Sequence, residues 1–433
     1  MSATGAEIKF GARKAAVWGT PVALGANTGF LITPSDYKKD QPFTVDDSLG
    51  LGWPTDGDLG EIKVDGNVKG YVRYDSLDLM IAMAMGAHSV AHTVPTTGGG
   101  AAASGTTTTL VKTAAGWAVD AFALAAGRFY ATVTAGTNSG VTRRIISNTA
   151  TQLTFAAMPV ACDATTVFTI SGAASTHVYT MAENTDGQFI SLCAKIGALQ
   201  VDEITTAKVA GFTITGGTGK PLGVAFKIIA HGLNKNTTSG TNDNTTILTV
   251  TFPETANRVL YKQLKFLINA GGGADFTDSD YPTGNRLYPA SFTFAFDRNL
   301  KGVYGVGGST DNIDEPTNDG NPTVSLDYEV ARHTAQTLGL ITAHAAGTAQ
   351  KIKMVFTGLL LSGATYRALT IEIPNAKFSA ADVPMKAGTL SVPFKMFCMG
   401  KSAAPTGMAN LTAPFRLTLV NQFGGDVLQE AIA

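Results

Sequence analysis

The chain has 433 residues, enough for two or three domains, and 44% of them are hydrophobic, so sizeable cores can form. Only 15% are charged and the formal net charge is −1, which excludes a protein that holds nucleic acid through a large basic surface. Three widely spaced cysteines, Cys162, Cys193 and Cys398, exclude a disulfide framework and a cysteine-based zinc site. The 48 glycines and the enrichment in Thr and Ala are typical of a turn-rich β protein whose lightly charged surface suits coverage by neighbouring subunits.

The first 60 residues are predicted to form an extended N-terminal arm. Gly, Pro and Asp interrupt them (GTPVALGANTGF, SLGLGWPTDGDLG) and their hydrophobic periodicity is weak. Trp18 and Trp53 lie in this arm. Because a large ring buries much apolar area at small entropic cost, both are predicted to anchor the arm on a neighbouring subunit. Packing within the same chain is the alternative.

Residues 61–91 and 177–240 are predicted to form a first β core. The stretch EIKVDGNVKGYVRY alternates apolar and polar residues as a half-buried strand does. A helical stripe over 77–84 follows, with Gly86 as its stop signal. Strands resume with HVYTMA and FISLCAKI.

Residues 92–176 interrupt this core and are predicted to be an inserted all-β surface module. They open with a low-complexity linker, HTVPTTGGGAAASGTTTT, and continue as short strands separated by turns such as GTNSG.

The rest of the chain is predicted to contain a second β core at 285–400. Residues 241–284 precede it as linking loops and a short helix in YKQLKFLINA, and residues 401–433 follow it as a C-terminal arm. Alternating stretches such as SFTFAFDRN and TVSLDYEV support strands in the second core.

An internal repeat connects the two predicted cores. The repeated motifs are Ala207-Lys208 with Phe226-Lys227-Ile228, Ala376-Lys377 with Phe394-Lys395-Met396, and Asp65-Gly66-Asn67 with Asp319-Gly320-Asn321. The spacing from Lys208 to Phe226 is nearly the same as the spacing from Lys377 to Phe394. Each Asp-Gly-Asn tripeptide precedes a strand and then a helix, which is expected over 335–343 in the second half. The spacing from Asp65 to Ala207 exceeds the spacing from Asp319 to Ala376 by the length of the 92–176 insertion. A duplication is therefore predicted, with two unrelated β domains as the alternative.

The sequence lacks the residue patterns of catalysis and metal binding. Its six histidines have no metal or catalytic spacing, and no nucleophile elbow or phosphate loop occurs. The acidic loops at 275–280 and 311–315 lack the EF-hand pattern; solvated loops are favoured, with calcium ligands or channel-lining carboxylates as alternatives. We therefore predict no enzyme, no catalytic residues, no cofactor and no metal site. A carbohydrate-active enzyme is a weaker alternative, because no spacing singles out a carboxylate pair.

Several stretches resemble the major tail tube proteins of long-tailed bacteriophages. They are KAAVWGT, DGNVKGYVRYDSLDLMIAMAMG, LTIEIPNAKF and LSVPFKMF, and the resemblance covers roughly residues 8–90 and 178–400. The inserted GRFYATVTAGTNSGVTRRIISNTATQLTF is similar to a small β module of phage structural proteins. The resemblance implies β-sandwich cores whose sheets join those of neighbouring subunits into a ring barrel around a DNA channel.

The expected fold is mainly β, with two tandem tail-tube-like β-sandwich or barrel cores, each with a short flanking helix, plus the inserted small all-β domain. The expected function is that of a structural tube subunit, in homotrimeric pseudo-sixfold rings with hexameric rings as the alternative. The resemblance implies tape measure and tail terminator or tip proteins as partners, transient passage of double-stranded DNA, and a virion tail made in the bacterial cytoplasm. No export signal or membrane span is expected. The inserted module is expected to point outwards, where it could contact the host surface. A capsid decoration protein or a host-surface-binding tail protein is the alternative.

Overall fold

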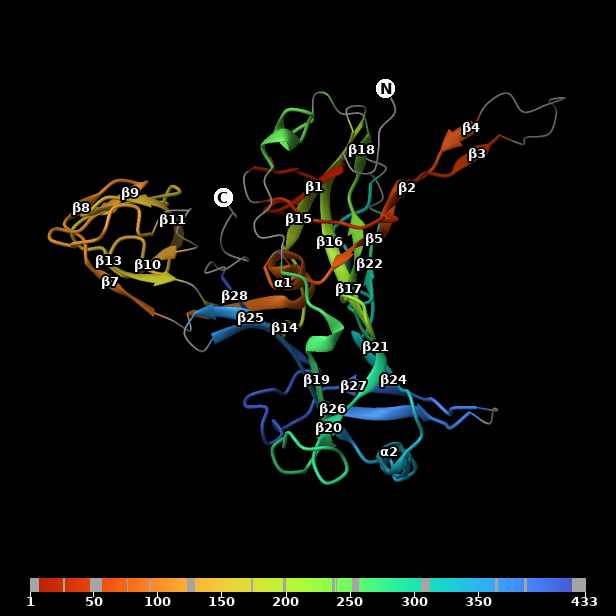
Figure 1. Ribbon diagram of the computed structural model, residues 1–433. Coiled ribbons are helices and arrows are strands. Elements are labelled where there is room, and N and C mark those ends of the chain that lie inside the picture. The colour runs from red at the N-terminus through yellow and green to blue at the C-terminus, as the bar shows by residue number, and fades with distance from the viewer. Residues whose placement is uncertain are drawn as a thin grey trace.

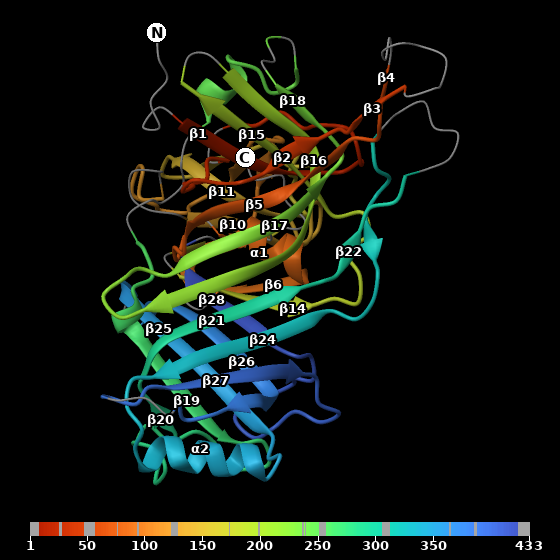
Figure 2. The same ribbon diagram turned by 90° about the vertical axis from the view of Figure 1, so that its right-hand side faces the viewer.

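The protein is mainly β, as the sequence predicts, and the computed structural model in Figures 1 and 2 describes most of the chain. The described residues are 8–25, 28–46, 57–75, 77–92, 95–122, 129–172, 174–197, 200–235, 238, 240–250, 257–304, 312–362, 365–384 and 388–422. Their helices are α1 (Asp78–Met85) and α2 (Ala335–Ala345), with short 3₁₀ turns η3 (Thr246–Thr249) and η4 (Tyr261–Gln263).

Seventeen strands belong to one connected sheet system. Those of the N-terminal half are β1 (Ile8–Ala15), β2 (Lys38–Asp40), β5 (Lys63–Tyr71), β6 (Gly86–His92), β14 (Ser175–Met181), β15 (Phe189–Ile196), β16 (Gln200–Gly217), β17 (Gly223–Ala230) and β18 (Leu233–Lys235). Those of the C-terminal half are β19 (Leu264–Ala270), β20 (Arg286–Leu287), β21 (Pro289–Asp297), β24 (Thr323–Val330), β25 (Gln350–Ser362), β26 (Thr365–Ala381), β27 (Val392–Met399) and β28 (Arg416–Asn421).

One layer of this system runs without a break through both halves. Its strand order is β2-β5-β17-β16-β21-β24-β27-β26, and every neighbouring pair is antiparallel. We call it the shared sheet. The long strands β16 and β26 also pair with β15 and β25 through their N-terminal parts, so each one passes from the shared sheet into a second layer.

A single hydrophobic core fills the space between these layers and the helices, and it contains residues from both halves. Phe212 of β16 packs on Phe226 of β17 at 6.1 Å between ring centroids, and on Phe294 of β21 at 6.2 Å. Phe415, just before β28, lies 6.2 Å from Phe212 and 5.1 Å from Phe294. The two halves are therefore joined by core packing as well as by strand pairing.

The two halves repeat the same order of strands with the same register. Strands β1, β5, β15, β16 and β17 correspond to β19, β24, β25, β26 and β27. Ala207 lies opposite Ala230, and Ala376 lies opposite Cys398. Ala230 stands four residues after Phe226, and Cys398 stands four residues after Phe394. The Ala-Lys and Phe-Lys motifs therefore occupy equivalent places in the two halves.

The β-bulges follow the same correspondence. The β16–β17 ladder shifts between Val209 and Gly211, and the β26–β27 ladder shifts between Phe378 and Ala380. Both shifts begin two residues after the Ala of the Ala-Lys motif. A bulge at the same position in both ladders is unexpected for two unrelated sheets, because bulges are specific features of a strand pair.

The third motif does not fit this correspondence. Asp65 lies opposite Ile229, and Ser325 lies opposite Phe397. Ile229 and Phe397 each stand three residues beyond the phenylalanine of the Phe-Lys motif, so Ser325 is the equivalent of Asp65. The tripeptide at 319–321 precedes β24 and has no counterpart in β5, so its match to 65–67 does not belong to the repeat.

The inserted segment forms a sheet of its own. Its strands are β7 (Pro95–Ala101), β8 (Ser104–Gly105), β9 (Thr109–Val111), β10 (Phe129–Ala135), β11 (Thr142–Asn148), β12 (Gln152–Phe155) and β13 (Val167–Gly172). A separate hydrophobic core lies between them, with Trp117, Phe155 and Phe168 among its members. Figure 1 shows this module on the side of the molecule opposite the shared sheet. Strands β6 and β14 pair with each other and lead into and out of the module.

Three predictions of local structure are wrong. Residues 8–15 are not part of a free arm, because every residue of β1 pairs with β15 and Phe10 is buried in the core. The predicted helix in YKQLKFLINA is the turn η4 followed by β19, since Phe266 and its neighbours pair with β25. The C-terminal segment up to residue 422 is not an arm either, because β28 pairs with β26 and β14. In each case pairing with a distant strand decides the local structure.

The other two predicted helices are present. The helix predicted over 77–84 is α1, and it ends at Gly86, whose φ of 83° is left-handed and favours glycine. The second is α2, which starts at Ala335 as predicted.

Candidate functional site: the uncovered face of the shared sheet

One face of the shared sheet packs on the core, and the described strands and helices leave most of the other face uncovered (Figure 2). The exception is the hairpin that follows β21. Alternation along each strand places small and polar residues on the uncovered face. In the centre of the sheet they are Thr213, Ala225, Thr293, Ala295, Thr323 and Ser325. Their intermediate or exposed positions contrast with the buried Phe and Leu residues between them in the same strands.

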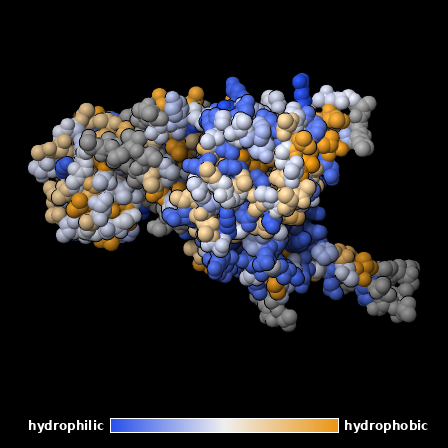
Figure 3. Space-filling view, turned by 90° about the horizontal axis from the view of Figure 1, so that it is seen from below, coloured by the Kyte–Doolittle hydropathy of each residue, from blue (hydrophilic) through white to orange (hydrophobic). Residues whose placement is uncertain are grey.

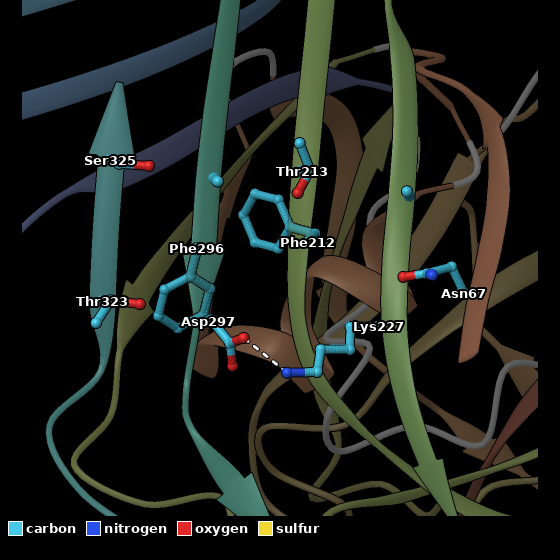
Figure 4. Close-up of a pocket in the computed structure, with 10 residues that line it drawn as sticks. Asn67, Phe212, Thr213, Lys227, Phe296, Asp297, Thr323 and Ser325 are labelled. Carbon is cyan, nitrogen blue, oxygen red and sulfur yellow. Dashed lines mark hydrogen bonds and ion pairs between the residues drawn. The ribbon is translucent and has the colours of Figure 1, made fainter. Parts of the chain in front are cut away.

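A shallow depression of about 180 Å³ lies on this face (Figure 4). Lys227 and Asp297 point toward each other across it, and Nζ of Lys227 lies 2.7 Å from Oδ2 of Asp297. Their side chains are 49% and 34% exposed, so this ion pair adds little stability. It does neutralise charge on the face, because each charge is held close to its opposite.

The position between these two residues requires glycine. Gly211 lies opposite Lys227 on one side and opposite Asp297 on the other. A Cβ at Gly211 would lie 2.1 Å from the carbonyl oxygen of Phe296. The absence of a side chain therefore lets β21 approach β16 closely and leaves Lys227 free to reach across the strand to Asp297.

A short hairpin covers the place where the two halves meet. It consists of strands β22 (Leu300–Lys301) and β23 (Thr317–Asn318), which follow β21 directly. Lys208 of β16 lies beneath this segment, with its side chain 1% exposed. Its Nζ donates to the carbonyl oxygen of Pro316 at 2.8 Å and lies 2.5 Å from Oε1 of Glu315.

An equivalent hairpin follows β2 at the free end of the shared sheet. It consists of β3 (Phe43–Val45) and β4 (Gly57–Leu59) and projects from the body of the protein (Figure 1). Phe43 is 59% exposed and Leu59 is 65% exposed. Hydrophobic surface appears on the projections at the right-hand side of Figure 3, the side on which Figure 1 places β3 and β4.

The two tryptophans predicted to anchor an arm have different positions. Trp18 is half-buried within its own chain: its Nε1 donates to the carbonyl oxygen of Ile313 at 3.0 Å, and its ring lies 5.3 Å from that of Phe189. Trp53 lies outside the described residues. A contact of either residue with a neighbouring subunit stays a prediction.

The acidic loops do not converge on one point. Asp278 forms an ion pair with Lys265 at 2.6 Å, and that lysine lowers the pKa of the Asp278 carboxyl. Asp280 accepts a hydrogen bond from Tyr288, whereas Glu315 pairs with Lys208 in the other half. Within the described part of the chain, no group of three or more His, Cys, Asp or Glu is placed to hold a metal ion.

No family model matches the sequence, and no curated protein matches it. Across the residues that the structure describes, no helix is long and apolar enough to span a membrane.

Sequence reasoning found the motif around Lys227 but not the partner of its charge. Asp297 lies seventy positions further along the chain, and only the pairing of β16 with β21 brings the two together. The repeat of Lys227 at Lys395 was the available signal. It indicates that the two lysines occupy equivalent places, but it does not identify the carboxylate beside either one.

Proposed function

We propose that this chain is a structural subunit of a phage tail tube, which assembles into stacked rings around a channel that conducts DNA. The observation that carries the proposal is the shared sheet: two repeats in one chain build a continuous layer with one apolar face and one small, polar face. Such a layer can extend through neighbouring copies and close into a barrel, which removes its free edges.

The uncovered face has the chemistry that a DNA channel requires. A channel must allow phosphates to pass without retaining them, and tight binding follows from unpaired Lys and Arg. On this face lysines stand beside carboxylates: Lys227 pairs with Asp297 at 2.7 Å, and Lys63 pairs with Asp65 at 2.8 Å. Lys395 lies directly opposite Asp327 in the β24–β27 ladder. The short Thr, Ser and Ala side chains between them leave the surface low and uniform.

The repeat also supports the ring symmetry. With two equivalent units in each chain, three chains supply six units, so we propose homotrimeric pseudo-sixfold rings, with hexameric rings as the alternative. If the uncovered face lines the channel, the inserted module projects outwards, because it lies on the opposite side of the molecule (Figure 1). Tape measure and tail terminator or tip proteins then belong among the partners, and the virion tail is the location.

Negative-stain electron microscopy of the purified chain tests the proposal. Hollow tubes of stacked rings with threefold or pseudo-sixfold averages are expected. Stable trimers that never stack and that bind host surface glycans would contradict it and would support a host-surface-binding tail protein. A reconstruction that places the inserted module inside the channel would overturn the proposed orientation.

A further inference from the structure

The junction between the two repeats is built around strand β21. It pairs with β16 of the first repeat on one side and with β24 of the second repeat on the other. Arg298 N donates to the carbonyl oxygen of Ala210 at 2.7 Å, so 210 and 298 form a hydrogen-bonded pair. The next pairs alternate, which makes Gly211 with Asp297 and Thr213 with Ala295 non-hydrogen-bonded pairs whose side chains approach closely.

Strand β2 is the equivalent of β21 in the first repeat. Lys38 lies opposite Asp65 of β5, and Ala295 lies opposite Ser325 of β24, the residue equivalent to Asp65. Lys38 therefore corresponds to Ala295. The residue before each points to the core: Tyr37 packs against it, as Phe294 does.

In the described part of the chain, two edges of the shared sheet remain open at its ends. On one side β2 pairs only with β5 among the described strands. On the other, the pairing of β26 with β25 ends at Ala376, opposite Gln350, although β26 continues alongside β27 to Ala381. The open edge of β2 is equivalent to the edge of β21, and the open edge of β26 is equivalent to the C-terminal part of β16. Inside the chain, β21 and this part of β16 pair with each other.

The charges on the two open edges are complementary. Lys395 corresponds to Lys227, since each follows the phenylalanine of its motif, and Lys395 lies opposite Ala380 as Lys227 lies opposite Gly211. Two residues beyond Lys38, Asp40 corresponds to Asp297. Lys395 and Asp40 are exposed. The two members of the Lys227–Asp297 ion pair therefore each have a counterpart at an open edge: Lys395 at one end of the sheet and Asp40 at the other.

We propose that β2 of one copy pairs antiparallel with the C-terminal end of β26 of a second copy, in the register of the β16–β21 junction. Asp40 then lies opposite Ala380 and forms an ion pair with Lys395 across it. Lys38 lies opposite Asp382, a second pair of opposite charges at a non-hydrogen-bonded position. Ala380 stands where β16 has Gly211, so β2 lies slightly farther from β26 than β21 lies from β16.

The exposure of neighbouring residues supports a second copy of the chain as the partner of these edges. Leu300 begins the hairpin after β21 and is 8% exposed, whereas its counterpart Phe43 is 59% exposed. Lys208 is 1% exposed, whereas its counterpart Lys377 lies in the open. Residues covered at the internal junction are thus uncovered at the two ends, as expected if a second copy covers them.

Disulfide cross-linking measures the register directly. The pair Lys38→Cys with Asp382→Cys is expected to form an interchain disulfide in high yield under mild oxidation, because opposed non-hydrogen-bonded positions lie within disulfide reach. The matched control is Lys38→Cys with Lys377→Cys. Lys377 lies on β26, five residues before Asp382, and is therefore out of register with Lys38. Equal cross-linking of both pairs, or none in either, would overturn the proposed register.

Charge reversal tests the ion pair. Lys395→Glu alone and Asp40→Lys alone are each expected to raise the concentration for half-maximal assembly about tenfold, because each replaces attraction by repulsion. The double variant is expected to recover most of that loss. Lys262→Glu, which changes an exposed lysine away from both edges, serves as the control. Failure of the double variant to recover assembly would contradict the ion pair.

The inference rests on the proposed tube, and the experiments separate the two. Tubes in the microscope without the 38–382 cross-link would overturn the edge pairing and leave the tube function standing. The cross-link in closed rings that never stack would support the edge pairing and contradict the tube.

Discussion

Arg298, directly after β21, donates from Nε to the carbonyl oxygen of Ala84 at 2.6 Å, although the two residues belong to different repeats. Its other nitrogens reach the carbonyl oxygens of Met85 at 2.5 Å and Ala182 at 3.1 Å. The side chain is fully buried, and burial lowers the pKa of the guanidinium to about 10, so it remains charged at neutral pH. A cation at the C-terminus of α1 is favourable because the helix dipole is negative there.

Replacing this residue is expected to destabilise the whole fold. Arg298→Met removes the side-chain donors of the Ala84 and Ala182 carbonyl groups, whereas the Met85 carbonyl keeps the N–H of Ala182 at 2.8 Å. Each buried group left without a partner costs about 1–3 kcal/mol, so we expect a loss of at least about 2 kcal/mol in the free energy of unfolding, measured by denaturant titration. Arg332→Met, at an exposed arginine, is the control. An unchanged midpoint for Arg298→Met would contradict this role.

Gly211 is expected to tolerate no side chain. A Cβ there would meet the carbonyl oxygen of Phe296 at 2.1 Å and Cα of Asp297 at 2.9 Å, both of which are backbone atoms that cannot move alone. Gly211→Ala is therefore expected to cost about 1–3 kcal/mol, as overpacking does. Gly219→Ala is a poor control, because its φ is +80°. Gly217→Ala is the better one, since its nearest atoms lie 4.0 Å away. Similar unfolding midpoints for both variants would show that β16 and β21 can separate without cost.

Much of the architecture could be predicted because strand periodicity is local. The alternation in SFTFAFDRN and TVSLDYEV gave β21 and β24, and the helical stripe gave α1. The repeat was visible because its Ala-Lys and Phe-Lys motifs lie in bulged strands whose geometry both halves retain.

The errors came from segments whose structure depends on distant partners. Residues 8–15 were assigned to the arm because Gly, Pro and Asp interrupt the first 60 residues and their hydrophobic periodicity is weak, yet these residues pair with β15. The short apolar run at 264–270 suits a helix or a strand equally, and pairing with β25 decides for the strand. The uncovered face could not be predicted, because the pairing of β16 with β21 joins the two halves into one sheet, and these strands lie far apart in the sequence.

The three cysteines are expected to be unreactive in the folded protein. All are buried; burial raises the pKa of the Cys193 and Cys398 thiols to about 12, and it also raises the pKa of Cys162. Because the thiolate is the reacting species, Ellman's reagent at pH 8 should label the native chain very slowly and the denatured chain at all three positions. Rapid labelling of one native thiol would contradict this and would require its replacement before the cross-linking experiment.

Lys208 and Lys377 are expected to respond differently to the same substitution. Lys208→Met removes the buried ammonium that holds Pro316 and Glu315, so the segment at 312–318 should detach more often. Its amide hydrogen exchange should accelerate about tenfold, with a loss of about 1–3 kcal/mol in stability of the monomer.

Lys377→Met, at the exposed equivalent position, should leave the stability and exchange of the monomer unchanged and weaken only self-association, measured by sedimentation velocity. If Lys377→Met destabilised the monomer as strongly as Lys208→Met, the two sites would differ less than their exposure indicates. If neither variant altered self-association, the equivalence of the internal junction and the open ends would lose its energetic basis.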